Sequence, residues 1–591
     1  MSETIVTDQT AAPAVLERWE RDFSRTKTDG ITYDYIIVGS GSAGAVLTNR
    51  LSEENDKRIL LIEAGGVDTK SEIHMPAAYS TLQRSDIDWQ YKSVPQLYSH
   101  FGCINQQSYW PRGKVLGGCS SINAMQYVRG DPHDYDNWQL PEWSFQEMLK
   151  YFKKLERADP NTIPRNEKFR NHDQENGMMN VTLIDDPNPI NRLFIEACKK
   201  HGFHESKDYN AEESLNGCVG MSQVSTKEGK RWSTASGYLL KAVKRQNVDL
   251  LTNTHVCRVV FDKQQQAIGV IVKRSNSLDQ EEFIKGKEVI LSAGAIGSPH
   301  ILLLSGIGPK EELDKHQIPI IVDSPGVGKN LLDHMFTLLV CLTQIPTSSV
   351  NDATAENLQK WAMQGKGPLA SCVIQSLAWC HSNGNDKTQT PNLQIHFSPG
   401  TPDAEAFKNV NIKPEFYEHY IKRNIIDDWQ WTVLCSPTLL HPKSKGEIIL
   451  ASRDPLVHPI INPNYLQDKE DVQILVEGCK LIEKIIQSEP LNNILKSGIK
   501  MNADESIENE DQFWESFVRK YSLTVYHPVG TCKMGKQEDS MSVVTSDTRV
   551  KGVKGLRVVD ASIMPSLVSG NTNIPVVALA ERAADLIKNN A

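Results

Sequence analysis

A glycine-rich turn near the N-terminus has residue types and spacing suited to binding a dinucleotide. Gly39, Gly41 and Gly44 follow the strand-like apolar residues 35–38 and lead into a helix-like segment. The first glycine allows a tight turn, the second lets the backbone approach phosphates, and the third lets helix and strand pack closely. Glu63 ends the next strand-like run, 19 residues after Gly44, where a ribose-binding carboxylate is expected. The pattern predicts a βαβ unit that binds either FAD or NAD(P).

A histidine near the C-terminus is a candidate for proton transfer. His527 directly precedes Pro528-Val529-Gly530-Thr531, a sequence that holds a loop rigid. Histidine suits the role of general base because its pKa lies near neutral. A histidine taken alone is more often a core residue, so this interpretation depends on the motifs around it.

Two further glycine-rich segments lie between these ends. Residues 111–124 contain Arg112 and the pair Gly117-Gly118, followed by small hydroxyl residues. Such a loop can turn backbone N–H groups toward an anion or a flat ring. Residues 294–309 follow a strand-like run, and their apolar stretch predicts a helix over residues 300–304 that ends at the glycine–proline sequence 305–309.

Composition indicates a globular chain and excludes some partners. With 591 residues, 39% of them hydrophobic, the chain can form two or more domains with sizeable cores. A net charge of −9 argues against nucleic-acid binding driven by charge, and no apolar run is long enough to span a bilayer. Eleven cysteines without CxxC spacing or a Cys/His cluster predict mostly buried thiols and no metal site.

The first 30 residues are polar and lack the apolar core of a secretory signal. The compartment therefore stays open between an intracellular protein and a secreted protein whose signal peptide has already been removed.

Together, the motifs resemble the glucose–methanol–choline (GMC) family of FAD-dependent oxidoreductases. The resemblance covers about residues 33–588, and the order of the motifs makes it specific. It implies FAD rather than NAD(P) as the cofactor. The segments that carry the resemblance are residues 39–44 with 63–66, 113–124, 294–309, 326–334, 527–535 and 559–565.

The resemblance implies an α/β fold with a discontinuous, Rossmann-like FAD-binding domain. A second, α+β domain of antiparallel sheet with flanking helices would bind the substrate. The composition shifts near residues 330 and 525 agree with this division. The expected organisation is a polar leader (1–30), the main FAD-binding part (31–330, with insertions at about 67–110 and 141–220), the substrate-binding domain (331–524) and a C-terminal return to the FAD-binding domain with the catalytic residues (525–591).

By the same resemblance, His527 is the catalytic base and Asn571 its polar partner. Asn573 competes for the second role, and we favour Asn571 because the family's catalytic position precedes the final turn. Asn573 would then help to hold the flavin. The other residues expected to bind FAD are Gly39, Gly41, Ser42, Gly44, Glu63, Ala64, Arg112, Gly117, Gly118, Ser121, Asn123, Ala124, Val256, Asp560, Ala561 and Ile574.

The resemblance also bears on how the flavin is attached. Some family members bond FAD covalently to a histidine just before the position of Asn123. Here that position is Ile122, which cannot form the bond, so FAD is expected to be non-covalent. Cys119 replaces the more usual Ser or Thr after the double glycine and is expected to be a small buried thiol.

The expected reaction is oxidation of a primary or secondary alcohol, aromatic alcohols included, to a carbonyl. Hydride would pass to flavin N5, and O2 or another acceptor would reoxidise the flavin. The alternative is a hydroxynitrile lyase of the same fold, acting on cyanohydrins through the same histidine. Sugar, choline-like, aromatic and aliphatic alcohols all remain open.

Overall fold

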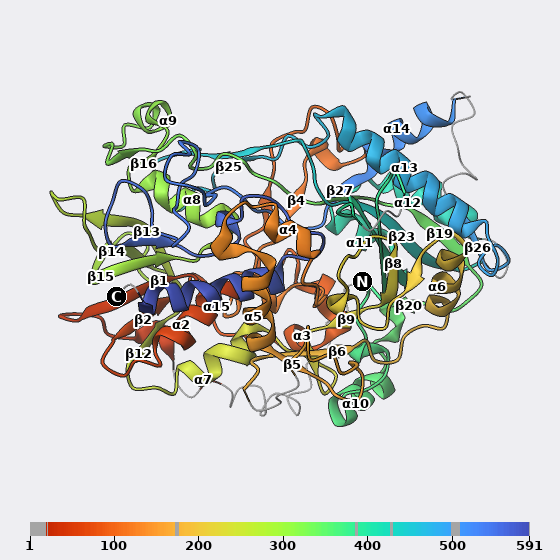
Figure 1. The fold of residues 1–591 in the computed structure, drawn as a ribbon, viewed down its shortest axis with the longest axis horizontal. Coiled ribbons are helices and arrows are strands. Elements are labelled where there is room, and N and C mark those ends of the chain that lie inside the picture. The colour runs from red at the N-terminus through yellow and green to blue at the C-terminus, as the bar shows by residue number, and fades with distance from the viewer. Residues whose placement is uncertain are drawn as a thin grey trace, which may run out of the picture.

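The computed structural model describes Trp19 and residues 22–171, 176–384, 388–425, 429–497 and 509–589. Most of the predicted polar leader lies outside these ranges. Its described part packs on the protein through the buried side chains of Trp19 and Phe23. The chain forms two halves, each built on one large sheet (Figure 1).

The first half contains a sheet in which five parallel strands are extended by two antiparallel ones. Its apolar strands are buried on both faces, as parallel strands covered by helices usually are. The strand order places β1 between β2 and β15, so the chain crosses to opposite sides of β1. The strands are, in order, β12 (Val248–Leu251), β2 (Ile59–Ile62), β1 (Thr32–Val38), β15 (Glu282–Leu291), β14 (Ala267–Arg274) and β13 (Thr254–Phe261), with β28 (Leu556–Val558) also paired to β15.

Two helices from opposite ends of the sequence pack side by side in this half. Helix α2 (Ser42–Leu51) follows β1, and α15 (Asn573–Asn589) ends the described chain (Figure 1). Ser42 donates a hydrogen bond to Asn573 Oδ1 at 2.6 Å, and Arg50 forms ion pairs with Glu581 and Asp585. The first residue of α2 contacts the first residue of α15, and Arg50 near the end of α2 contacts residues further along α15. The two helices therefore run parallel, and their N-termini meet.

The second half contains a ten-stranded, mostly antiparallel sheet. In β22 the side chains alternate as a pleated sheet requires: Ile395 and Phe397 enter the apolar core, whereas His396 and Ser398 face a cavity. The strands in order are β26 (Leu495–Ser497), β19 (Val340–Thr343), β23 (Trp431–Leu439), β22 (Leu393–Thr401), β21 (Ser376–Cys380), β8 (Cys218–Met221) and β7 (His204–Glu205), with β18 (Met335–Thr337), β27 (Ser522–Thr524) and β20 (Ser348–Ser349) paired off this path.

The fold confirms the predicted class: a Rossmann-like parallel sheet joined to an antiparallel sheet with helices. The chain returns to the first sheet through β28, after the second sheet is complete. Strands β7 and β8, from the predicted insertion at 141–220, join the antiparallel sheet. The helix predicted from the apolar run after residue 300 begins earlier, at Gly294, with Pro299 inside it.

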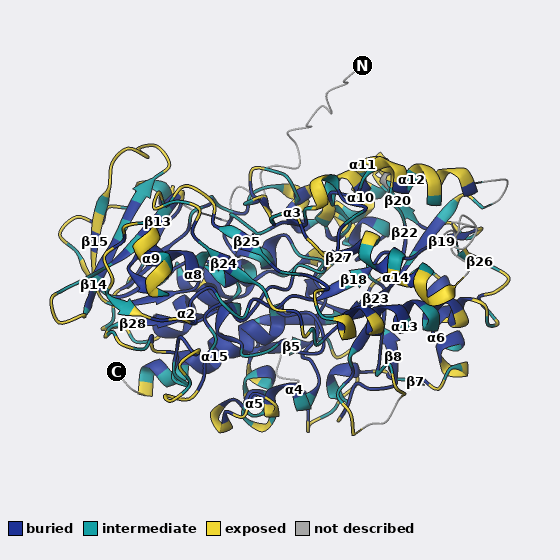
Figure 2. Cartoon of the chain, turned by 90° about the horizontal axis from the view of Figure 1, so that it is seen from above, coloured by how far each residue is buried: buried dark blue, intermediate teal, exposed yellow. Residues whose placement is uncertain are grey.

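Burial follows the two sheets. Most strands of both halves are buried, whereas the first half of β15 is partly exposed and α10, α11 and α12 carry much of the exposed surface (Figure 2). Ten of the eleven cysteines are buried free thiols, which confirms the prediction of mostly buried thiols. The expectation that Cys119 is buried was wrong: its free thiol is half-buried, because the residue lines an open cavity. No helix among the described residues is long and apolar enough to cross a membrane.

The remaining elements are short strands and further helices. The helices are α3 (Ser71–His74), α4 (Pro132–Asp136), α5 (Phe145–Leu155), α6 (Ile190–Lys200), α7 (Leu240–Ala242), α8 (Gly294–Leu304), α9 (Lys310–Lys315), α10 (Ala355–Gln364), α11 (Ala404–Asn409), α12 (Pro414–Tyr420), α13 (Lys469–Ile486) and α14 (Glu510–Tyr521). The strands are β3 (Tyr91–Lys92), β4 (Tyr109–Trp110), β5 (Glu156–Ala158), β6 (Met179–Leu183), β9 (Gln223–Val224), β10 (Thr226–Lys227), β11 (Lys230–Arg231), β16 (Ile307–Gly308), β17 (Val322–Asp323), β24 (Glu447–Ile449) and β25 (Ile460–Asn462).

A buried ion network ties the segment around β5 to its neighbours. Glu156 accepts hydrogen bonds from Arg129 at 2.6 Å and Arg170 at 2.8 Å, and Arg170 also pairs with Asp208 at 2.5 Å. Burial raises the pKa of Glu156, but the two guanidinium groups outweigh it and hold that pKa below its ordinary value. The network therefore balances two buried cations with two buried anions.

Removing Glu156 should destabilise the fold strongly. Glu156→Ala leaves two buried guanidinium groups facing one carboxylate, and breaking a buried pair costs about 3–5 kcal/mol. We expect a clear fall in the thermal unfolding midpoint measured by circular dichroism. The matched control is Glu213→Ala, which removes a carboxylate whose pair with Lys168 is exposed. Equal unfolding midpoints for Glu156→Ala and the control would show that this buried ion network does not stabilise the fold.

Candidate active site

A cavity of about 850 Å³ lies between the two sheets and collects residues from both. Most of the predicted site residues line it, although they come from distant parts of the chain. Gly44, Gly117, Ser121 and Ile574 do not line it and lie next in sequence or in space to residues that do. The predicted residues that line the cavity are Gly39, Gly41, Ser42, Glu63, Ala64, Arg112, Gly118, Asn123, Ala124, Val256, His527, Asp560, Ala561, Asn571 and Asn573.

The turn after β1 leaves no room for side chains at two of its glycines. A Cβ on Gly39 would lie 2.6 Å from the carbonyl oxygen of Ser292, and one on Gly44 would lie 1.8 Å from that of Gly39. Gly41 differs, because a Cβ there would meet only Gly118 Cα, at 3.8 Å, and would otherwise face the cavity. The turn therefore offers bare backbone at the edge of the cavity, as a pyrophosphate requires.

The positive ends of two helices converge on the cavity. Ser42 at the start of α2 and Asn573 at the start of α15 both line it and are hydrogen-bonded to each other. Aligned peptide dipoles give a helix N-terminus about half a positive charge. This end of the cavity therefore suits anionic groups, and a dinucleotide phosphate fits it.

Two buried carboxylates complete the same end. Glu63 accepts from the backbone and hydroxyl of Ser40 and from the backbone of Gly65. Asp560 accepts from the backbone of Gly294 and from Ser298. Burial raises the pKa of both carboxyl groups despite these hydrogen bonds.

A buried arginine holds the second glycine-rich loop in place through hydrogen bonds. Arg231 donates to the carbonyl oxygens of Ser120 and Asn123 and to Asn123 Oδ1. Burial lowers the pKa of Arg231 to about 10. Ser121 caps the same loop by donating to the carbonyl of Leu116, so it supports the loop rather than lining the cavity.

At the other end, two histidines share a hydrogen bond that determines their tautomers. His334 Nε2 lies 3.0 Å from the carbonyl oxygen of Leu440, which can only accept, so Nε2 carries a proton. Burial lowers the pKa of His334 to about 3, so its ring is neutral and its Nδ1 is bare. His527 Nδ1, 3.0 Å away, must donate to it. His527 therefore keeps an unprotonated Nε2.

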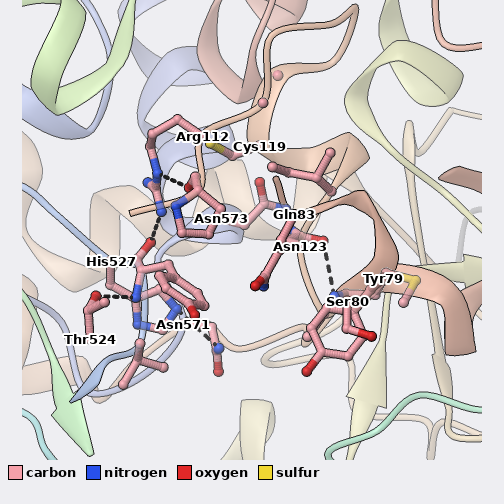
Figure 3. A pocket seen from close by; sticks show the side chains of 18 of the residues that line it. Tyr79, Ser80, Gln83, Arg112, Cys119, Asn123, Thr524, His527, Asn571 and Asn573 are labelled. Carbon is pink, nitrogen blue, oxygen red and sulfur yellow. Dashed lines mark hydrogen bonds between the residues drawn. The ribbon is translucent and has the colours of Figure 1, made fainter. Parts of the chain in front are cut away.

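The bare nitrogen of His527 faces Asn571. Asn571 Nδ2 lies 3.3 Å from His527 Nε2, and Asn571 Oδ1 is buried with no partner among the described residues. Both side chains line the cavity, and Tyr79 and Ser80 lie across the open space from them (Figure 3). A buried amide oxygen and a bare imidazole nitrogen at one wall form a site for a hydroxyl group.

Electrostatics keep His527 in its basic form. Burial, and then the neighbouring His334, hold the pKa of His527 well below the ordinary value of 6.5. The imidazole is consequently neutral at pH 7 and available to accept a proton.

Surrounding residues hold this pair in place. Asp333 accepts from the backbone N–H of His527 at 2.8 Å and from Thr524 at 2.5 Å. The loop before Asn571 is anchored through Ser569, which donates to Asp134 and accepts at its carbonyl from Trp379.

The competing asparagine occupies a different place. The hydrogen bond to His527 comes from Asn571, while Asn573 bonds to Ser42 at the helix N-termini.

Sequence reasoning missed His334, Asp333 and Arg231. The first two close the segment 326–334, whose resemblance to the family was noted without a role for them. The sequence predicts no metal site. Among the described residues, one group could hold a metal ion by its geometry: the ligand atoms of His204, Glu212 and Cys218 lie within 4.8 Å of one another, and these residues do not line the cavity.

Comparison with known proteins identifies the family. Two patterns, both described as GMC oxidoreductase, match residues 33–336 and 442–580. The alcohol dehydrogenase [acceptor] of Pseudomonas putida is 37% identical over 571 residues, covering 94% of this chain and 95% of that protein. The oxygen-dependent choline dehydrogenase of Photobacterium profundum is 35% identical, covering 95% and 93%.

Solved structures agree. The pyridoxine 4-oxidase from Mesorbium loti superimposes with a TM-score of 0.79 at 27% identity, covering 94% of this chain and 99% of that one. A fungal aryl-alcohol oxidase shares the fold, with a TM-score of 0.75 at 22% identity and coverage of 95% and 99%.

The chain therefore belongs to the GMC oxidoreductase family. It is an FAD-dependent oxidoreductase that acts on alcohols or related substrates.

A side chain at Gly41 should weaken FAD binding without disturbing the fold. In Gly41→Ala the new methyl group meets no atom of the protein closer than 3.8 Å but enters the space next to the turn. We expect the Kd for FAD, measured by fluorescence titration of the apoprotein, to rise about 10-fold, equivalent to about 1.4 kcal/mol.

The matched control is Gly66→Ala, since a Cβ there lies 3.6 Å from Asn253 and outside the cavity. Its Kd should stay at the wild-type value. Wild-type affinity in Gly41→Ala would show that the phosphates do not approach this turn.

Proposed function

We propose that the protein oxidises an alcohol to a carbonyl compound, with His527 as the base and Asn571 as its hydrogen-bonding partner. The observation that carries the proposal is the bare Nε2 of His527, buried at a cavity wall beside the unpartnered Oδ1 of Asn571. FAD supplies the hydride acceptor when bound.

Proton and electrons leave the substrate by separate routes. His527 Nε2 takes the hydroxyl proton, which leaves the electron pair on oxygen to form the carbonyl π bond. FAD, when bound, would supply the acceptor for the hydride of the carbinol carbon, and O2 or another acceptor would reoxidise it. Asn571 has no basic nitrogen, so it orients the substrate oxygen and leaves proton abstraction to His527.

The residues that would bind FAD fall into two groups. The bare turn Gly39–Gly44, Ser42 and the N-terminus of α15 would hold the phosphates, and Glu63 would bind ribose. Arg112, Asn123 and the Gly117-Gly118 loop would hold the flavin side. The remaining cofactor contacts in this assignment are Ala64, Ser121, Ala124, Val256, Asp560, Ala561, Asn573 and Ile574.

The flavin would be held without a covalent bond, because the position of the family's linking histidine is Ile122. In this assignment, residues 31–330 and 525–591 form the cofactor half and residues 331–524 most of the substrate wall. The relatives support an alcohol substrate, because their names include an alcohol dehydrogenase, a choline dehydrogenase and a pyridoxine 4-oxidase.

Replacing His527 should abolish rapid flavin reduction while leaving FAD bound. The protein is mixed anaerobically with a panel of alcohols, and loss of the oxidised flavin absorbance is followed by stopped flow. His527→Ala should slow reduction roughly 10²- to 10⁴-fold, the usual contribution of a general base. Because only neutral His527 accepts the proton and its pKa is held well below 6.5, wild-type reduction should stay insensitive to pH down through 6.5 and fall only at pH values well below it.

Wild-type rates in His527→Ala would contradict the assignment of the base. The absence of bleaching with every alcohol, together with cyanide release from a cyanohydrin, would replace alcohol oxidation by the lyase reaction.

His334 should act on the rate through the tautomer of His527. His334→Ala removes the acceptor for His527 Nδ1–H, and a lost partner for a buried donor costs about 1–3 kcal/mol. We expect the limiting rate of flavin reduction to fall about 10-fold with little change in the apparent Kd for the alcohol. His334→Asn, which offers an oxygen near the position of Nδ1, should recover part of the rate. An equal loss in both variants would indicate a role in packing alone.

A further inference from the structure

Three side chains with metal-binding atoms lie together at one edge of the antiparallel sheet, where β7 is the last strand after β8 (Figure 2). His204 on β7 is paired in register with Cys218 on β8, so the two residues are neighbours across parallel strands. Glu212 comes from the loop that joins these strands. The ligand atoms of the imidazole, the carboxylate and the thiol lie within 4.8 Å of one another. None of the three residues lines the cavity, so the group is separate from the candidate active site.

The imidazole of His204 has a buried nitrogen that makes no hydrogen bond. His204 Nε2 is buried and has no hydrogen-bond partner among the described residues. Glu212 Oε2 lies 3.7 Å from it, which is too far for a hydrogen bond. Buried polar atoms are nearly always hydrogen-bonded, so an exception needs a physical reason. This nitrogen is therefore available as a ligand.

The spacing of the three atoms suits a tetrahedral zinc ion. Zinc binds nitrogen and carboxylate oxygen at about 2.0–2.2 Å and thiolate sulfur at about 2.3 Å, so two atoms on one ion lie about 3.3–3.7 Å apart. The distance of 3.7 Å between His204 Nε2 and Glu212 Oε2 fits this range. Small side-chain rotations would close any longer distance in the group, because none exceeds 4.8 Å.

Neighbouring groups hold the ligands in position. Ser206 Oγ donates a hydrogen bond to Glu212 Oε1 at 2.6 Å, which leaves Oε2 on the side of His204. The backbone N–H of His204 donates to the carbonyl oxygen of Gly217, next to Cys218, at 2.8 Å. Hydrogen bonds of this kind orient the ligands of metal sites. The chain therefore fixes two ligands without help from an ion.

The chemistry of the donor atoms selects the metal. One nitrogen, one sulfur and one carboxylate oxygen suit Zn²⁺, whereas Mg²⁺ and Ca²⁺ prefer oxygen ligands. Cys218 is buried, while His204 and Glu212 are half-buried. An ion can consequently reach the group from solvent and keep one water molecule as its fourth ligand.

We propose that His204, Glu212 and Cys218 bind one Zn²⁺ ion. The zinc–sulfur bond forms as the thiol of Cys218 loses its proton to solvent, and no redox change occurs. The ion joins β7, the loop of residues 206–217 and β8.

The role of the ion in this proposal is structural. The loop of residues 206–217 carries Asp208, which pairs with Arg170 in the buried ion network. It also carries Asn210, which accepts a hydrogen bond from the backbone of Arg129 at 2.7 Å. Zn²⁺ therefore holds a loop on which other parts of the fold depend. Because this site exists only in the folded chain, Zn²⁺ should stabilise the protein against unfolding.

The test titrates the FAD-bound protein with Zn²⁺ after a chelator has been used and dialysed away. A chromophoric chelator competes for the ion and reports the affinity. We expect one Zn²⁺ per chain with a Kd of about 1 μM or below, and a higher thermal unfolding midpoint at saturating Zn²⁺. Co²⁺ is added to a second sample, and a difference spectrum against the metal-free holoenzyme should show thiolate-to-metal charge transfer.

Variants locate the ion. Cys218→Ser and His204→Gln should each weaken Zn²⁺ binding more than about 100-fold, beyond the loss that an outer hydrogen bond accounts for. Cys218→Ser should also abolish the charge-transfer band and the rise in midpoint. Glu212→Gln should weaken binding, whereas the matched control Glu213→Gln should not, because Glu213 is exposed and pairs with Lys168.

The outcomes are independent of the proposed alcohol oxidation. Zn²⁺ bound by the wild type and by Glu213→Gln, but lost from Cys218→Ser and Glu212→Gln, supports the site. No binding by the wild type overturns it, and that result needs no variant to fold. Binding with an unchanged charge-transfer band in Cys218→Ser places the ion elsewhere and also overturns the proposal.

Discussion

The hydrogen bond between His334 and His527 is the interaction on which the proposed chemistry depends. An imidazole is a base only through its bare nitrogen, and which nitrogen is bare is decided by the partner of the other one. The carbonyl of Leu440 orients His334, and His334 in turn orients His527. This relay ends with His527 Nε2 at the cavity, and burial keeps both rings neutral.

The relay requires a rigid frame, and the frame comes from the antiparallel sheet. Met335, next to His334, is paired with Thr524, close to His527. Asp333 reinforces the junction by accepting from His527, Thr524 and Tyr465. Burial raises the pKa of Asp333 to about 6 despite these bonds. The parallel sheet supplies the opposite side through α2 and α15, whose joined N-termini lie where the cofactor phosphates are expected.

The sequence alone predicted the parts of this arrangement that depend on motifs of neighbouring residues. The turn at Gly39–Gly44 and the segment at His527 carry their roles in local spacing, and the order of the motifs predicted both sheets. His334 could not be assigned in the same way, because its role depends on the pairing of β18 with β27. The residues that line the cavity from the antiparallel sheet could not be predicted either. Phe336 and Leu434, for example, line it because of strand register and the alternation of side chains, which the sequence alone does not reveal. The choice of Asn571 over Asn573 stays a prediction; the structure shows Asn571 hydrogen-bonded to His527 and Asn573 hydrogen-bonded to Ser42.

The most direct test of the central claim is a crystal structure of the FAD-bound enzyme, reduced and soaked with an alcohol so that turnover stops. We expect the alcohol oxygen within hydrogen-bonding distance, about 2.6–3.2 Å, of His527 Nε2 and near the side-chain amide of Asn571. His527 Nδ1 should remain bonded to His334. An alcohol oxygen bound elsewhere, or a His527 ring turned so that Nδ1 faces the cavity, would contradict the account.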